Sequence, residues 1–554
     1  MGFVTATEIL PPDLPSGRAK LVLTGFSGSG KTTVGREVAG RLRLPFIDLD
    51  EIVADRAGHS VEQIFESLGE GGFRALERAA LTDAAKLSGC VVATGGGAVT
   101  DSDRFRQLAA GAVVVVLDCD RAETQRRLLG SHPRPLLEPE RARTISSLMR
   151  EREAAYAAAG PLVSTTGRSV AEVAAEVEAR YRAAVPPGPA EVRVTDGPSS
   201  YPVLIGPSAV AKLGEAVARE IGEVQRAVVI ADALVAGTAG QATATALRAG
   251  GLQVVALQVP AGEAAKRIQV VARLWEQLSA LGADRHDLIV AVGGGAALDA
   301  IGFAAATFAR GLPLVNVATT LLAMADAAIG GKVAIDHSGT KNSVGAFHQP
   351  RLVVADPEFL ATLPVGILRQ GLAEVLKAAV LGSPLTLHLI KQSVGASSRQ
   401  DWSWLVEQAV RIKAAYVAVD PGDLGARQAL NLGHTFAHGL ESASDYALSH
   451  GEAVAVGLLA AAKLGANLGL SPTGLALELQ ELARGLELPQ DPPSGLDPVR
   501  VLQAMAGDKK RRAGRAVFVV PRRDGGALLV EGLELAWAVR FLWPDGEPAA
   551  GAGS

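Results

Sequence analysis

Two histidines four residues apart, His434 and His438, stand in the otherwise apolar run LNLGHTFAHGLE. Residues four apart lie on one face of a helix, so both imidazoles could face one metal ion. A catalytic zinc site usually takes three protein ligands and keeps one position open, so two histidines are not enough. Glu374, in RQGLAEVLKAAV, and His450, in SHGEAV, are available as further ligands. The residues alone predict a metal site and leave four candidates for its ligands.

Polar residues surround a glycine-rich turn in the same half of the chain. The run IVAVGGGAALDAIGF, residues 289–303, reads as a strand, a turn and a helix. Its GGG is a weak indication of dinucleotide binding, because the G-x-G-x-x-G spacing is absent. The flanking runs PAGEAAK and ATTLLAMADAAIGGK add hydroxyls, carboxylates and amines, which strengthens the interpretation.

The first half contains a phosphate-binding loop. Residues 25–32 read GFSGSGKT, between the apolar run KLVLT and the helical pattern TVGREVAGRL. The glycines allow backbone N–H groups to surround phosphates, Lys31 reaches the outer phosphates, and Thr32 can bind Mg²⁺. We therefore predict a nucleoside triphosphate site here.

Further polar residues indicate an acceptor site beside this loop. Asp48 and Asp50, in FIDLDEIV, point the same way if the segment is extended, so one could serve Mg²⁺ and the other a substrate hydroxyl. Arg74, the glycines Gly95–Gly97 after a predicted strand, and Arg134 in HPRPLLE complete the set. Arginine suits an anionic acceptor, because its planar fork pairs with a carboxylate.

The elements that position these residues are strands alternating with helices. β-Branched runs separated by amphipathic segments predict parallel sheets wrapped by helices in both halves. The run VPPGPAEV ends the first half, because its prolines cannot continue a helix. From about residue 350, Ala, Leu and Glu recur at helical spacing. The expected divisions are a tail (1–19), a P-loop α/β domain (20–184), a linker (185–190), a nucleotide-binding α/β part (191–349), a mostly helical part (350–542) and a second tail (543–554).

The composition indicates folded protein and excludes several classes. Of 554 residues, 48% are apolar and 20% charged, and 54 Lys+Arg against 58 Asp+Glu give a formal charge of −4. This balance argues against nucleic-acid or membrane binding. Cys90 and Cys119 are too few for a disulfide framework, and the N-terminus has no export signal pattern. We expect a cytoplasmic protein.

Residues 20–170 resemble shikimate kinase in the P-loop, FIDLDEIV, GEGGFRALE, ATGGGAV and HPRPLLE. The resemblance implies transfer of the ATP γ-phosphoryl group to a hydroxyl of shikimate. Asp48 would serve Mg²⁺, Asp50 would orient and deprotonate the hydroxyl, and Arg134 would belong to a lid. The remaining implied contacts are Gly28, Gly30, Lys31, Thr32, Thr33 and Arg127 for ATP and Mg²⁺, and Arg74, Arg152, Gly95, Gly96 and Gly97 for shikimate.

About residues 190–540 resemble 3-dehydroquinate synthase, in LPLVNVATTLLA, IGGKVAID, KNSVGAFHQP, GLAEVLKAAV, LNLGHTFAHGLE, LSHGEAVAVGLL and GDKKRRAG. The resemblance implies Zn²⁺, or Co²⁺, held by Glu374, His434 and His450, with His438 left to contact a phosphate. It also implies a bound NAD⁺ that takes a hydride from the sugar-acid phosphate and returns it after phosphate has left. A homodimer through this half is expected.

The same resemblance assigns residues to this reaction. Asp326 would position hydroxyls, and several groups would converge on the substrate anions: Arg310, Lys332, Asn342, Lys377, Lys413, Arg427, Asn431, His438, Lys509 and Lys510. NAD⁺ would contact Asp232, Glu263, Lys266, Gly294, Gly295, Asp299, Thr319 and Thr320.

Several residues depart from the family pattern near the cofactor or the substrate. Leu298 stands where the run GGG-x-x-GD has glycine and adds bulk near the expected pyrophosphate. Met324 replaces an amide, Ala327 and Ala328 replace hydroxyls, and Pro421 and Asp423 stand where two glutamates are common. The sequence leaves open whether these changes alter activity.

The leading hypothesis is a bifunctional enzyme of aromatic amino acid biosynthesis. In the alternatives, the second half is another sugar-phosphate cyclase, a metal-dependent alcohol dehydrogenase or an impaired synthase, or the first half is a regulatory nucleotide-binding module. A simple dehydrogenase has no need for so many cations aimed at a phosphate. The two family activities are non-adjacent steps, so no direct transfer of an intermediate is expected.

Overall fold

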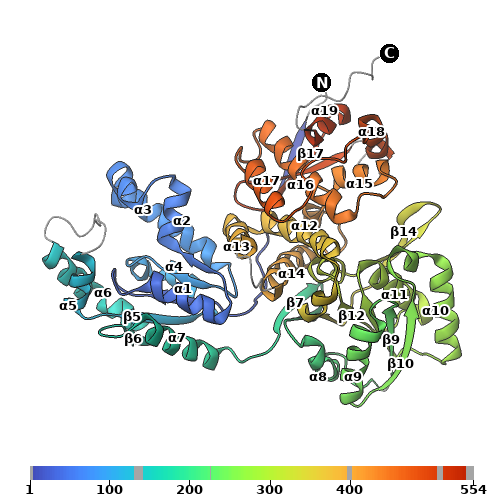
Figure 1. Ribbon diagram of the computed structural model, residues 1–554, viewed down its shortest axis with the longest axis horizontal. Coiled ribbons are helices and arrows are strands. Elements are labelled where there is room, and N and C mark those ends of the chain that lie inside the picture. Colours follow the sequence, from blue (N-terminus) through green and yellow to red (C-terminus); the bar gives the residue numbers. More distant parts are fainter. Residues whose placement is uncertain (1–3, 130–140, 225, 396–401, 508–515, 544–554) are drawn as a thin grey trace. The chain divides into compact units, whose positions relative to one another are not determined.

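A computed structural model describes residues 4–129, 141–224, 226–395, 402–507 and 516–543 (Figure 1). The chain divides into two compact units. One comprises Ser16–Pro187, and the other combines Met1–Pro15 with Gly188–Ser554. The smaller unit is therefore inserted in the sequence of the larger one.

The smaller unit is a five-stranded parallel sheet with helices around it. Its strand order is β3-β4-β2-β5-β6. The strands are β2 (Leu21–Thr24), β3 (Phe46–Asp48), β4 (Val91–Ala93), β5 (Val113–Asp118) and β6 (Leu162–Ser164). The helices are α1 (Lys31–Leu42), α2 (Leu49–Ala57), α3 (Val61–Ala85), α4 (Ser102–Ala109), α5 (Arg121–Leu129), α6 (Arg141–Ala159) and α7 (Val170–Ala184). Its core is formed by β-branched and leucine side chains, as the sequence pattern predicts.

After Gly188, the larger unit forms a seven-stranded sheet in the order β10-β9-β11-β12-β15-β8-β7, antiparallel between β7 and β8. Its strands are β7 (Ala190–Asp196), β8 (Ser199–Ile205), β9 (Arg226–Asp232), β10 (Gln253–Val259), β11 (Leu288–Gly293), β12 (Leu314–Ala318) and β15 (Leu352–Ala355). Helices α8 (Leu213–Glu220), α9 (Gln241–Ala249), α10 (Ile268–Ala280) and α11 (Gly295–Thr307) accompany it. A hairpin of β13 (Lys332–His337) and β14 (Thr340–Phe347) lies outside the sheet.

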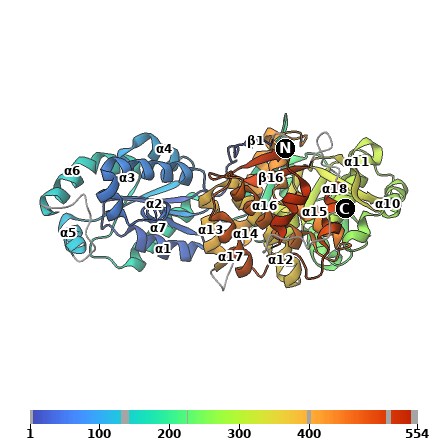
Figure 2. The ribbon, with the colours of Figure 1, turned by 90° about the horizontal axis from the view of Figure 1, so that it is seen from above.

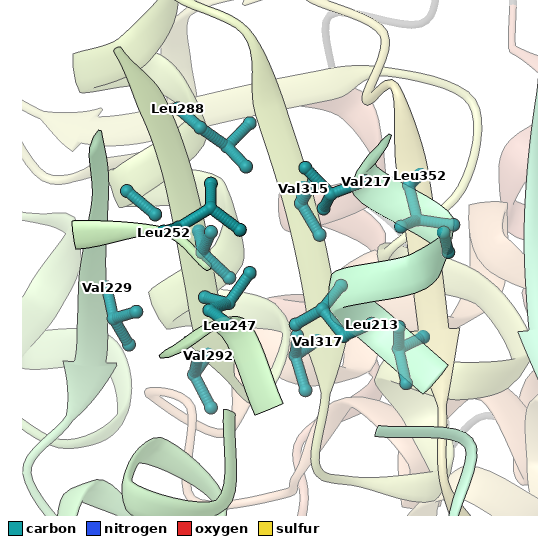
Figure 3. Packing of buried hydrophobic residues seen from close by; sticks show 14 of the residues in the cluster. Leu213, Val217, Val229, Leu247, Leu252, Leu288, Val292, Val315, Val317 and Leu352 are labelled. Carbon is teal, nitrogen blue, oxygen red and sulfur yellow. The ribbon is translucent and has the colours of Figure 1, made fainter. Parts of the chain in front are cut away.

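Figure 3 shows the core on one face of this sheet, where Val229, Val292, Val315 and Val317 project from adjacent strands toward α8 and α9. These side chains are at most 2% exposed. β15 lies within the part expected to be helical, because its apolar run LVVA completes the sheet beside β12.

The rest of the larger unit is mostly helical. Its helices are α12 (Val365–Gly382), α13 (Pro384–Gly395), α14 (Trp402–Val419), α15 (His434–Ala443), α16 (His450–Asn467), α17 (Leu475–Gly485), α18 (Pro498–Gly507) and α19 (Leu535–Val539). The predicted class, a P-loop sheet followed by an α/β part and a helical part, is thereby confirmed.

The N-terminal segment is part of this larger unit, in place of the expected loose tail. Strand β1 (Thr5–Ile9) pairs antiparallel with β17 (Ala527–Glu531), which also pairs with β16 (Val517–Pro521). Figures 1 and 2 show β1 among the C-terminal elements. Main-chain pairing over hundreds of residues has no local sequence signal, so the five-residue run TATEI did not reveal it.

The described part of the chain contains no helix that combines the length and apolarity needed to cross a membrane.

Candidate active sites of the two units

Three side chains converge in the larger unit, and their ligand atoms all lie within 4.8 Å of one another. His434 Nε2 lies 3.5 Å from Glu374 Oε1, and His450 Nε2 lies 3.3 Å from the same oxygen. Glu374 is 2% exposed. One carboxylate and two imidazoles form a donor set that suits catalytic zinc. His438 lies outside this group, with its ring centroid 5.7 Å from that of His434.

Glycines allow the helices that carry these ligands to approach closely. A Cβ on Gly451 would lie 2.2 Å from the carbonyl oxygen of Gln370 on α12, so the start of α16 packs against the helix of Glu374. A Cβ on Gly457 would lie 2.2 Å from the carbonyl oxygen of Gly433, at the start of α15. These two contacts bring His434 and His450 to Glu374.

Both histidines are oriented through Nδ1. The Nδ1–H of His434 donates to the Leu432 carbonyl at 3.2 Å, and that of His450 donates to Glu441 Oε1 at 3.0 Å. Each Nε2 is thereby left facing Glu374. Such outer hydrogen bonds commonly fix the tautomer of a metal-binding imidazole, so the residues fit a metal ion. Burial opposes the imidazolium of His450, but Glu374 and Glu441 raise its pKa to about 9.

Two lysines and an aspartate lie beside this group. Lys413 Nζ is 2.7 Å from Asp326 Oδ1, and Lys377 Nζ contacts Glu374 Oε2. Burial lowers the pKa of Lys413 to about 8, and Asp326 opposes this only in part. Burial also opposes the charge of Asp326, yet Lys413 and Lys377 hold the pKa of that carboxyl below its usual value. The pKa of Lys377 is raised, because Glu374 and Asp326 outweigh burial.

A loop between α14 and α15 orients the predicted substrate-binding Arg427. Arg427 is 2% exposed and donates to the Pro421 carbonyl at 2.9 Å and the Gly330 carbonyl at 2.9 Å. Asp423 contacts Lys332. Asn431 ends the 3-10 helix that contains Arg427, whereas Arg310 lies exposed in another 3-10 helix.

The glycine turn leads from β11 into α11, where Gly294 is the N-cap. A Cβ on Gly294 would lie 3.1 Å from Thr320, and Thr319 N donates to the Gly293 carbonyl at 3.0 Å. The N-terminus of a helix that begins directly after such a turn can bind the pyrophosphate of a dinucleotide.

Polar residues predicted to contact that dinucleotide make contacts within the protein. Lys266 Nζ lies 2.6 Å from Asp299 Oδ2 and 2.5 Å from Asn342 Oδ1. Burial raises the pKa of Asp299 to about 6, against the effect of Lys266. Glu263 lies 3.8 Å from Lys341. Asp232 accepts hydrogen bonds from Leu234 N and Gly262 N, so both of its oxygens shape the adjacent loops.

The residues near this turn that differ from the family pattern are packed inside the protein. Leu298 is 2% exposed within α11, and Met324 is fully buried. A Cβ on Gly295 would lie 3.2 Å from that of Ala327. Ala328 is 1% exposed.

The phosphate loop of the smaller unit borders a cavity of about 440 Å³. Thr32 Oγ1 donates to Asp48 Oδ2 at 2.5 Å, and Lys31 Nζ donates to the Gly25 carbonyl at 2.8 Å. Arg127 binds the Gly28 carbonyl at 3.3 Å and the Thr165 carbonyl at 3.0 Å. The lining residues are Gly28, Ser29, Gly30, Lys31, Thr32, Thr33, Val34, Asp48, Asp50, Thr94, Arg127, Thr165, Arg168, Val170 and Val173. The cavity is lined by the residues predicted to bind phosphates and by those predicted to bind Mg²⁺. These residues therefore fit a nucleoside triphosphate with Mg²⁺.

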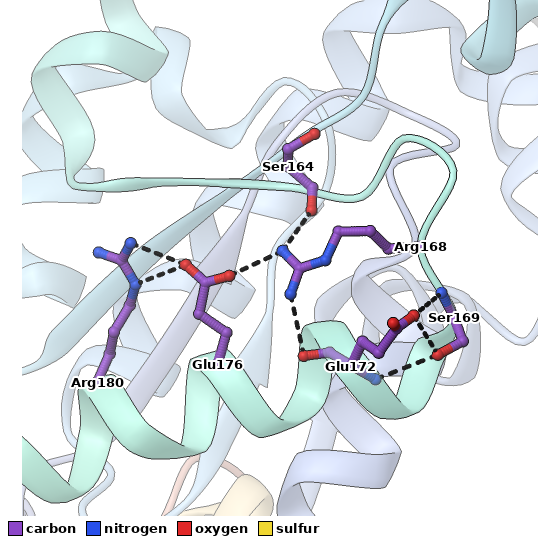
Figure 4. Close-up of polar contacts among 6 residues, drawn as sticks. All are labelled: Ser164, Arg168, Ser169, Glu172, Glu176 and Arg180. Atoms are coloured by element: carbon purple, nitrogen blue, oxygen red, sulfur yellow. Dashed lines mark hydrogen bonds and ion pairs between the residues drawn. The ribbon is translucent and has the colours of Figure 1, made fainter.

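Figure 4 shows how the loop before α7 is held at the rim of this cavity. Arg168 donates to Glu176 at 2.7 Å and to the carbonyls of Ser164 and Glu172. Ser169 and Glu172 form a capping box at the start of α7. The motif S-x-x-E could have located this helix start, but not the part that Arg168 plays in the cavity.

Each of the glycines Gly95, Gly96 and Gly97 lies beside a different side chain that is predicted to bind the acceptor. A Cβ on Gly95 would lie 2.7 Å from Asp50 Oδ1, and one on Gly97 would lie 2.4 Å from Arg74. Arg152 donates to the Gly96 carbonyl at 2.8 Å. Side chains in place of these glycines would displace the groups predicted to bind the acceptor.

Sequence reasoning missed several residues that contact predicted site residues. Glu441 contacts His450, Glu77 accepts from Arg74 at 2.6 Å, and the Tyr156 hydroxyl donates to the Gly96 carbonyl at 2.5 Å. Glu77, three residues after Arg74, had the helical spacing of an ion pair as a signal. Arg134, Lys509 and Lys510 lie outside the described residues.

Family models match three segments of the chain. Residues 27–182 match shikimate kinase, residues 256–370 match "3-dehydroquinate synthase N-terminal", and residues 371–511 match "3-dehydroquinate synthase C-terminal". The 3-dehydroquinate synthase of Symbiobacterium thermophilum is 42% identical over 353 residues, which are 62% of this chain and 99% of that protein.

Two solved structures resemble the larger unit. ValA, a 2-epi-5-epi-valiolone synthase from Streptomyces hygroscopicus subsp. jinggangensis 5008 with NAD⁺ and Zn²⁺ bound, is 27% identical over 62% of this chain and 95% of its own, with a TM-score of 0.55. A 2-deoxy-scyllo-inosose synthase complexed with carbaglucose-6-phosphate, NAD⁺ and Co²⁺ is 24% identical over 64% of this chain and 99% of its own, with a TM-score of 0.58, which supports the fold alone.

Proposed function

This chain belongs to the 3-dehydroquinate synthase family and carries a shikimate kinase domain at residues 27–182, and we propose that each of its two units performs one of these two activities. The kinase activity resides in Ser16–Pro187, and the synthase activity resides in the larger unit. The convergence of Glu374, His434 and His450 beside Lys377 and Lys413 carries the synthase assignment.

In the kinase, the phosphate loop holds the ATP phosphates through its backbone N–H groups, and Lys31 neutralises charge that develops during transfer. Thr32 and Asp48 hold Mg²⁺. Asp50 accepts the proton of the attacking shikimate hydroxyl. Arg74 and Arg152 bind the carboxylate of shikimate against Gly95–Gly97, which aligns the hydroxyl for attack.

In the synthase, Glu374, His434 and His450 hold the metal, and Gly294, Gly295 and Asp299 hold the nucleotide. Bound at these residues, Zn²⁺ would supply Lewis acidity toward a substrate hydroxyl, and NAD⁺ would supply a reversible hydride acceptor. Asp326 orients the substrate hydroxyls. Lys377, Lys413, Arg427 and His438 bind the carboxylate and phosphate of 3-deoxy-D-arabino-heptulosonate 7-phosphate, which favours departure of the phosphate.

A second candidate for the larger unit is cyclisation of a different sugar phosphate. The solved structure of ValA, a 2-epi-5-epi-valiolone synthase with NAD⁺ and Zn²⁺ bound, supports this candidate. The alanines Ala327 and Ala328 support this candidate, because they replace hydroxyls common at these positions. The 42% identity to a 3-dehydroquinate synthase over nearly its whole length favours dehydroquinate.

The test is to supply 3-deoxy-D-arabino-heptulosonate 7-phosphate, NAD⁺ and Zn²⁺ to the purified full chain. We expect 3-dehydroquinate and phosphate in equal amounts, with no net NADH. Accumulation of NADH with a simple polyol would favour a dehydrogenase, and turnover of another sugar phosphate alone would favour the second candidate. For the smaller unit, absence of shikimate-dependent ADP release would favour a regulatory module.

We further propose a cytoplasmic homodimer that associates through the synthase part. Cys90 and Cys119 are buried free thiols, which suits a reducing compartment. The dimer rests on family resemblance, and a sedimentation measurement on the full chain tests it.

A further inference from the structure

We infer that Glu441 fixes the His450 imidazole in its metal-binding orientation and thereby sets the metal affinity of the synthase, without being a ligand itself. This inference rests on the proposed metal site of Glu374, His434 and His450. It concerns a residue that lies between two of the ligands in sequence and outside their group in space.

Glu441 is placed for this purpose by the packing of two helices. It lies seven residues after His434 on α15, two turns along the same face. The contact between α15 and α16 brings its carboxylate to His450, and Glu441 is 6% exposed. Its Oε1 accepts from His450 Nδ1 at 3.0 Å, which directs Nε2 toward Glu374, 3.3 Å away.

The two histidines differ in how they are held. His434 is anchored by a main-chain carbonyl, and its side chain is 10% exposed. His450 is the first residue of α16, where the Ser449–Glu452 capping box fixes only the backbone, and its side chain is 34% exposed. The carboxylate of Glu441 therefore restricts rotation of the His450 ring from its Nδ1 side.

A carboxylate that accepts from Nδ1 also makes Nε2 a better electron-pair donor to a metal ion, because it stabilises partial positive charge on the ring. Removal of an outer partner of this kind typically weakens metal binding by about 10–100-fold. We expect the loss of zinc affinity in Glu441→Ala to lie in this range. Glu441→Gln should be affected less, since the amide oxygen can still accept from Nδ1.

The experiment measures zinc affinity of full-length protein by competition with a chromophoric chelator. The variants are Glu441→Ala, Glu441→Gln and the ligand substitution Glu374→Gln. Asp356→Asn is the matched control, because Asp356 is a buried carboxylate of the same unit that accepts from Val210 N and Glu358 N, away from the metal group. Thermal unfolding of each variant reports its folding.

We expect a graded loss, smallest for Asp356→Asn, greater for Glu441→Gln and Glu441→Ala, and largest for Glu374→Gln. Wild-type affinity in a folded Glu441→Ala protein would overturn the inference, as would an equal loss in Asp356→Asn. If Glu441→Ala unfolds, the result for Glu441→Gln decides in the same way. Failure of the wild type to bind zinc, or full binding by Glu374→Gln, would instead refute the proposed metal site.

Discussion

Asp50 connects the phosphate and acceptor sides of the kinase site. Its backbone N–H donates to Asp48 Oδ1 at 3.0 Å, and Asp48 in turn accepts from Thr32 of the phosphate loop. Its own carboxylate lies against Gly95. The side chain is thereby held between the phosphate loop and Gly95, where we propose that it meets the hydroxyl that attacks ATP.

We expect Asp50→Asn to lower kcat for shikimate phosphorylation by about 10²–10⁴-fold, because the amide cannot accept the proton. ATP binding and synthase activity should change little. Coupled ADP release and phosphate release, measured on one preparation, test both expectations. A kcat within a few-fold of wild type would remove Asp50 from the proposed role.

Lys413 predicts a pH dependence of the synthase. Its pKa in the folded protein is about 8, below the usual 10.5, chiefly because it is buried. The ammonium is therefore lost as pH rises through about 8, and kcat/KM should fall there, since this parameter reports the free enzyme. Lys413→Arg should move the fall to higher pH, because arginine remains charged. An unchanged profile would show that another group controls it.

At the scale of elements, close contacts between helices determine the metal site. Gly451 allows α16 to meet α12, and Gly457 allows it to meet α15. The three ligands come from the three helices, so a shift of any one helix would separate them.

Gly451→Ala should push α16 away from α12, because the added Cβ would lie 2.2 Å from the Gln370 carbonyl. We expect weaker zinc binding and a loss of about 1–3 kcal/mol in the free energy of unfolding of this unit. Gly366→Ala is the matched control, since nothing lies within 4 Å of its Cβ on the same α12. Equal zinc affinity in the two variants would contradict this account.

The sequence predicted the elements better than their contacts. The phosphate loop was evident because its glycines and lysine are local, and the β-branched runs of β9 and β11 identified strands. Glu441 was missed because its contact with His450 depends on how α15 packs against α16. β1 was missed because its partner β17 lies over 500 residues later.

At the scale of the whole molecule, β1 makes the kinase an insertion within the synthase. Ile9 is 7% exposed, Glu8 contacts Arg522, and Arg411 Nε donates to the Pro15 carbonyl at 2.8 Å. Arg411 lies two residues before Lys413 on α14. The segment before the kinase therefore binds the synthase unit, and the kinase is connected to that unit at both ends.

A cleavable site placed at 186–188 tests this connection. After cleavage, the N-terminal fragment should still co-elute with the synthase fragment, because the main-chain hydrogen bonds of an added edge strand hold it. The matched variant lacks residues 4–10 and should separate after cleavage. If the two fragments of the cleaved wild-type chain separate, or if those of the variant co-elute equally well, β1 does not keep the N-terminal fragment bound to the synthase fragment.

The most direct test of the central claim compares the wild type with Glu374→Gln in both assays, at saturating Zn²⁺ and NAD⁺. The wild type should phosphorylate shikimate and convert 3-deoxy-D-arabino-heptulosonate 7-phosphate to 3-dehydroquinate, and the variant should retain only the kinase. Wild-type protein that phosphorylates shikimate but forms no 3-dehydroquinate, or a Glu374→Gln variant with an intact synthase, would contradict the account.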